Sequence, residues 1–131
     1  MAFYKETLKI GEKLEKMGWK VLYPESALIM KARNDFNPSH FKNSITPEQR
    51  GKFIKFHFEK ELKSQAILVV NKTKKGIKGY IGGNALMEMG IAFGANIKIY
   101  ILHPLGKNHP FYEEIVAMSP IVLGNNLRNL K

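Results

Sequence analysis

The chain contains no cysteine and only one aspartate, Asp35, which excludes several kinds of chemistry. Without thiols it has no disulfide framework, no cysteine nucleophile and no zinc site built from thiolates. A Ser-His-Asp triad would depend on Asp35 alone, and no Gly-x-Ser-x-Gly turn is present to carry the serine. The four histidines, at positions 40, 57, 103 and 109, do not have the spacing of a metal-binding set. We therefore expect no metal and no cofactor.

Long apolar runs are also lacking, since none approaches the ~20 residues that span a bilayer. The segment Met1–Glu6 has no apolar core of a signal peptide. We expect a cytoplasmic protein that does not contact membranes. Its 131 residues, 44% of them hydrophobic, can bury one core, and no repeat or linker divides them. The sequence therefore predicts a single domain over residues 1–131.

Acidic residues are scarce: 21 lysines and arginines face 11 acids, which gives a net charge of +10. Such a charge favours an anionic partner, and nucleic acid is the first class to weigh. The basic cluster Lys72, Lys74, Lys75 and Lys78 has only Tyr80 nearby for stacking, however, and is more typical of a solvated loop. We therefore expect a small anionic ligand such as a nucleotide, and not nucleic acid.

Predicted helices alternate with apolar strands along the chain. We expect helices over 4–17, 47–63, 84–94 and 110–118, and strands over 19–23, 66–70, 97–102 and 121–123. The segments 25–46 and 72–83 are expected to be loops, the first because it has no sustained apolar period and contains Pro38. Thr46 and Gln49 form a capping-box pattern around Pro47. The run Ala66–Val70 is typical of a central strand buried on both faces. This order predicts an α/β layered sheet with right-handed crossovers.

Ligands of such sheets bind outside the carboxyl ends of the strands, which here are Tyr23, Asn71 and His103. The turn Gly79–Gly83 leads from that edge into the predicted helix carrying Glu88, the only carboxylate between Leu62 and Tyr112. Glu88 is either a catalytic carboxylate or a structural ion pair or solvated position. The glycines of the turn either let the backbone approach a sugar or phosphate or form a mobile surface turn.

The segments Ala66–Asn71, Gly79–Ala92, Lys98–Leu102 and Phe111–Leu123 together resemble the nucleoside 2-deoxyribosyltransferase-like superfamily, in particular its small uncharacterised members. The resemblance covers most of the chain. Its most specific part is the Glu-x-Gly-x-Ala pattern that begins at Glu88. Membership implies a three-layer flavodoxin-like or Rossmann-like fold, with a mostly parallel sheet and helices on both faces.

The resemblance also implies cleavage or transfer at the N-glycosidic bond of a (deoxy)nucleoside or its 5′-monophosphate. Glu88 matches the family nucleophile, which attacks the anomeric carbon. The substrate-binding positions implied are Asn71, Tyr80, Gly82, Gly83 and Asn84. A homodimer is implied as well. The base, the sugar and the need for a phosphate are left open, as is the choice between transferase and hydrolase.

The sequence departs from the family pattern at three points. The family opens with a strand and a Gly-Ser loop, and this chain begins where that loop ends, so we expect either a missing first strand or a start assigned too late. Gln65 stands where the family usually has an aspartate that handles the leaving base, and Gly82 stands where the transferase subgroup has one. The alternative function is therefore a catalytically inactive nucleotide-binding module of the same fold.

Overall fold

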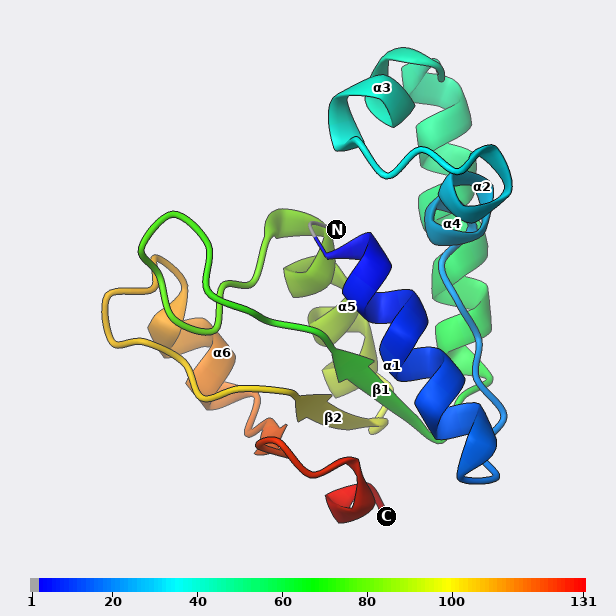
Figure 1. Cartoon of the computed structure of the whole chain (residues 1–131). Coiled ribbons are helices and arrows are strands. Elements are labelled where there is room, and N and C mark those ends of the chain that lie inside the picture. Colours follow the sequence, from blue (N-terminus) through cyan, green and yellow to red (C-terminus); the bar gives the residue numbers. More distant parts are fainter. Residues whose placement is uncertain (1–2) are drawn as a thin grey trace. The chain divides into compact units, whose positions relative to one another are not determined.

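A computed structural model describes residues 3–131 (Figure 1). The chain divides into two compact units, one that reaches Lys60 and one that begins at Glu61, and each is described by itself as the N-terminal or the C-terminal unit. Within residues 3–131, no helix combines the length and apolar character needed to cross a membrane. The expected single domain stays a prediction.

The N-terminal unit consists of helices. They are α1 (Tyr4–Lys16), α2 (Glu25–Arg33), α3 (Pro38–Asn43) and α4 (Pro47–Leu62), the last of which extends two residues into the C-terminal unit. The predicted first helix and the helix after Thr46 are confirmed to within a residue. The capping box is confirmed too, because the backbone N–H of Gln49 donates to Thr46 Oγ1 at 3.1 Å, and Thr46 N–H donates to Gln49 Oε1 at 2.9 Å.

Two predictions for this unit are wrong. Residues 19–23 form no strand, because the only sheet in the described residues is built from strands that follow residue 65. The predicted loop 25–46 contains α2 and α3. Proline 38 begins α3 instead of excluding a helix, since the missing N–H of proline is harmless at the first helical position. The Asn37 side chain caps that helix by accepting from Ser39 N–H at 2.9 Å.

The C-terminal unit contains a parallel sheet, and helices alternate with its strands along the chain, as expected of an α/β fold. Its elements are β1 (Ala66–Val69), α5 (Gly83–Gly94), β2 (Lys98–Ile101), α6 (Tyr112–Ala117), β3 (Ile121–Val122) and the short 3₁₀ helix η1 (Leu127–Asn129). The strand order is β1-β2-β3. The prediction that residues 66–70 form a central strand is therefore wrong, since β1 lies at an edge of the described sheet and β2 at its centre.

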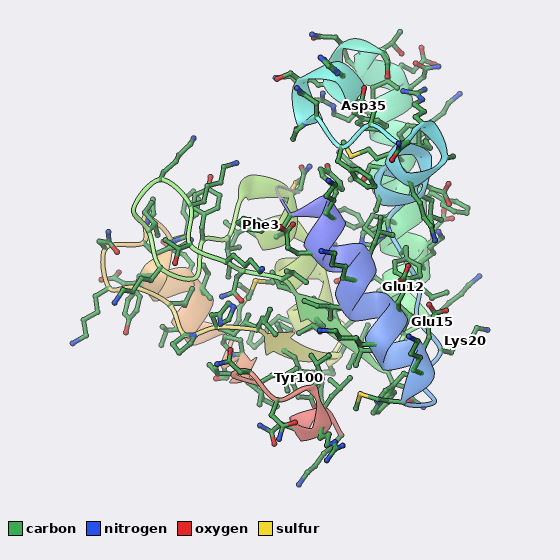
Figure 2. The ribbon with its side chains drawn as sticks, viewed as in Figure 1. Phe3, Glu12, Glu15, Lys20, Asp35 and Tyr100 are labelled. Carbon is green, nitrogen blue, oxygen red and sulfur yellow. The ribbon has the colours of Figure 1, made fainter. Side chains whose placement is uncertain are left out.

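The core of this unit lies between one face of the sheet and the helices α5 and α6. Its buried residues come from alternate strand positions and from one side of each helix: Val69, Ile81, Ala85, Met89, Ala92, Ile99, Ile101 and Ile115. On the opposite face Tyr100 is 2% exposed. Its hydroxyl donates to the carbonyl oxygen of Lys131 at 3.2 Å, so the end of the chain reaches this face of the sheet (Figure 2).

Candidate functional site

The carboxyl ends of β1 and β2 are joined by the side chain of Asn71. This residue directly follows β1 and is fully buried. Its Nδ2 donates to the carbonyl oxygen of His103 at 2.7 Å, and its Oδ1 accepts from His103 N–H at 2.9 Å. The amide thus continues the pairing of the two strands beyond their last backbone bonds. The structure shows this bridging role, and ligand binding by Asn71 stays a prediction.

The loop after β1 returns to the same edge at Gly79. Asn71 Nδ2 also lies 3.4 Å from the Gly79 carbonyl oxygen. A Cβ atom added to Gly79 would lie 3.0 Å from Asn71 Nδ2 and would collide with the carbonyl oxygen of Pro104. The backbone of Gly79 also has a φ of +64°, which side chains rarely adopt. Glycine at this position therefore lets three backbone segments meet at the strand ends.

His109 anchors the entrance to α5 and is 4% exposed. Its Nε2 lies 3.0 Å from Ile81 N–H, and its Nδ1 lies 3.0 Å from Phe111 N–H. A neutral imidazole has one lone-pair nitrogen, so it accepts from only one of these donors at a time, and a protonated ring would accept from neither. Burial lowers the pKa of His109 below its ordinary value of 6.5. The neutral ring therefore fits this position.

Tyr80 lies beside this anchor. Its ring centroid is 6.0 Å from that of His109, and the ammonium of Lys74 lies 5.5 Å from the Tyr80 centroid. The Tyr80 N–H donates to the carbonyl oxygen of Lys72 at 2.9 Å. The structure therefore gathers Asn71, Tyr80 and the start of α5 at one end of the C-terminal unit, as the sequence predicts for the strand-end edge.

Helix α5 begins at this edge without a side-chain cap. Gly82 is its N-cap residue, and Gly83 and Asn84 in the first turn are exposed. Glu88 is half-buried in the second turn, next to the fully buried Met89. Because Asn84 and Glu88 are four residues apart, they lie on the same side of the helix. The carboxylate is therefore carried on a helix that starts at the strand-end edge.

The single aspartate serves the local structure of the N-terminal unit (Figure 2). Asp35 accepts a hydrogen bond from Asn37 N–H at 3.0 Å, and its second oxygen lies 2.9 Å from His40 Nδ1. The bond from Asn37 and the contact with His40 lower the pKa of the Asp35 carboxyl. These contacts give Asp35 a structural role in the loop before α3, and no catalytic role is needed to account for this residue.

Sequence reasoning did not single out His109. The available signal was its position between Pro104 and Pro110, in a short loop that follows a buried strand. Among residues 3–131, no three histidine or acidic side chains are gathered so as to hold a metal ion.

Comparisons of the chain with family models, with curated proteins and with solved structures found no match. The likeness to the deoxyribosyltransferase-like superfamily therefore rests on the sequence motifs alone.

Proposed function

We propose that the protein cleaves or transfers at the N-glycosidic bond of a (deoxy)nucleoside or nucleoside 5′-monophosphate, with Glu88 as the nucleophile. The observation that carries the proposal is the position of Glu88, half-buried in the second turn of a helix that begins at the carboxyl edge of a parallel sheet. The proposal includes the finer fold, a flavodoxin-like three-layer sheet, and a homodimer.

In the proposed reaction a Glu88 oxygen bonds to the anomeric carbon, and the bond to the base nitrogen breaks with its electron pair passing to the base. A carboxylate beside the anomeric carbon stabilises the oxocarbenium-like transition state and then holds the sugar as an ester. Water or a second base displaces the ester and restores the carboxylate. The excess of basic residues favours an anionic substrate such as a 5′-monophosphate.

The test is incubation of the full chain with deoxynucleosides and their 5′-monophosphates, scored by chromatography for free base. Glu88→Gln should reduce base release to the rate without protein, and Glu113→Gln, which changes an exposed glutamate of α6, should leave it unchanged. A covalent sugar adduct trapped by acid quenching should map to the peptide containing Glu88. Equal activity in Glu88→Gln and the unmodified chain would refute the nucleophile.

One observation supports the second candidate, an inactive nucleotide-binding module. Gln65 is exposed and cannot supply a carboxyl proton, and Glu88 is the only carboxylate between Leu62 and Tyr112. A departing base would lack the acid that usually protonates it. The module predicts that deoxynucleotides raise the melting temperature equally in the unmodified chain and in Glu88→Gln, with no base released by either.

A further inference from the structure

The loops after β1 and β2 lie at one end of the C-terminal unit (Figure 1, bright green and yellow). Together they carry five lysines. They are Lys72, Lys74, Lys75, Lys78 and Lys107, and all but the half-buried Lys72 are exposed. Neither loop contains a carboxylate. We call these five residues the two-loop lysine surface. The sequence alone showed four of them as a run in one loop, and the structure adds Lys107 from the other.

The first loop is held as a tight hairpin. Lys74 N–H donates to the Ile77 carbonyl oxygen at 3.1 Å, and Ile77 N–H donates back at 2.9 Å. The two residues between them have positive φ, +54° at Lys75 and +73° at Gly76, as in a type I′ turn. The first of these positions favours asparagine, aspartate or glycine, so turn preference does not explain the lysine there.

The two loops are fixed to each other. Gly106 N–H donates to the Lys78 carbonyl oxygen at 2.8 Å, and a Cβ atom added to Gly106 would lie 3.3 Å from Lys78 Cβ. Lys107 directly follows Gly106, so the second loop carries this lysine close to the backbone of Lys78 in the first loop. Positive charges held close together without acidic neighbours create a potential that favours a ligand carrying several negative charges.

The lysines of α1 provide a contrast within the same chain. Lys9, Lys13 and Lys16 are exposed, but they share their helix with Glu6, Glu12 and Glu15. Figure 2 labels Glu12 and Glu15 on this helix. These carboxylates offset the charge locally. The two-loop lysine surface is therefore distinguished from α1 by the absence of any carboxylate within its two loops.

The sequence alone predicts a small anionic ligand and not nucleic acid, but it does not show that Lys107 joins the other four lysines. From this arrangement we propose that the two-loop lysine surface binds the phosphodiester backbone of nucleic acid without reading its sequence. Lysines are point charges suited to phosphate contacts, and neither loop contains an arginine or a helix to enter a groove. Nucleic acid is favoured over an anionic membrane because the hairpin tip presents no exposed apolar side chain to insert, Ile77 being half-buried.

The test measures binding of the full chain to a fluorescent 20-base-pair DNA duplex by anisotropy between 50 and 200 mM salt. Contacts from all five lysines predict a slope of log K against log salt of about −4.5, at roughly −0.9 for each phosphate neutralised. The variant Lys74→Gln/Lys75→Asn/Lys78→Gln should weaken this slope by about 2.7. Asparagine is chosen at position 75 because it fits the left-handed turn.

The matched control Lys9→Gln/Lys13→Gln/Lys16→Gln removes the same charge from α1 and should leave the slope unchanged. Equal losses in both triple variants would assign binding to net charge and overturn the proposal. A preference between two duplexes of different sequence, or binding to phosphatidylserine vesicles but not to the duplex, would overturn it as well. Glu88→Gln should bind the duplex normally, so this test is independent of the proposed catalysis.

Discussion

Replacing Asn71 by alanine should lower the free energy of unfolding by about 2–4 kcal/mol. The substitution removes both hydrogen bonds to His103 and leaves its backbone N–H and C=O without these partners. A buried polar group left unsatisfied costs about 1–3 kcal/mol. Asn71→Ala leaves two backbone groups of His103 without a partner, and because His103 is only half-buried we expect the loss in the free energy of unfolding to be about 2–4 kcal/mol.

Urea denaturation followed by far-UV circular dichroism measures the loss. Hydrogen exchange followed by NMR locates it, because the His103 amide donates to Asn71 Oδ1 and should exchange faster in Asn71→Ala. Asn84→Ala is the control, since this exposed asparagine in α5 should change stability by less than about 0.5 kcal/mol.

A result in which Asn71→Ala unfolds at the same urea concentration, with unchanged exchange at His103, would refute the bridging role. The Asn71 side chain would then be available to bind a ligand. The Asn71→Asp variant sharpens the test, because it keeps an acceptor for His103 N–H but places a carboxylate oxygen against the His103 carbonyl. We expect it to be at least as unstable as the alanine variant at neutral pH.

Three further predictions concern packing, capping and pH. Burial lowers the pKa of His109, so the stability that the neutral ring contributes is complete above pH about 6.5 and is lost as the pH falls toward the folded-state pKa. His109→Gln should remove this pH dependence of the free energy of unfolding, measured by urea titrations at pH 5–8. Gly11→Ala should destabilise the N-terminal unit by about 1–3 kcal/mol, because the new methyl group would lie 2.6 Å from Tyr23 Cζ. Gly51→Ala has open space around the new methyl group and should stabilise α4 by about 0.5–1 kcal/mol. The fluorescence of the single tryptophan during urea denaturation measures both changes in stability. Thr46→Ala should cost about 1 kcal/mol in the same assay through loss of its cap, and an unchanged midpoint would contradict the capping role.

Elements whose signals are local could be predicted from the sequence. Thr46, Pro47 and Gln49 encode the start of α4 within four residues, and the structure confirms both bonds of the capping box. The segments that form β1 and β2 were recognised by their continuous apolar character, and their parallel pairing by the helix between them.

What depended on distant partners could not be predicted. Residues 19–23 have strand-like composition, but a strand exists only where another segment pairs with it. The edge position of β1 is likewise a property of the whole sheet. Proline 38 was ambiguous because the same residue ends a helix at an interior position and begins one at its first position.

The candidate site was predictable in place but not in detail. Strand ends in an α/β sheet identify the edge, and Asn71 and His103 are brought together there. The inward orientation of Asn71 depends on the loop that returns to it at Gly79. The burial of His109 depends on the backbone of residues 81 and 111, thirty positions apart, which no local pattern encodes.

The excess of lysines in the C-terminal unit favours substrate binding in the proposed reaction but does not help the base to leave. Lysines near the strand-end edge can attract a phosphorylated substrate, which supports binding. Breaking the glycosidic bond also requires the base to leave, and ammonium groups are poor proton donors at neutral pH, while Gln65 offers no acid. Nucleosides whose base departs without needing a proton, such as those alkylated on the purine ring, should therefore react faster than their parents if Glu88 acts alone. Equal rates for an N7-methylated deoxyguanosine and its unmethylated parent would mean that some other group in the protein supplies the proton.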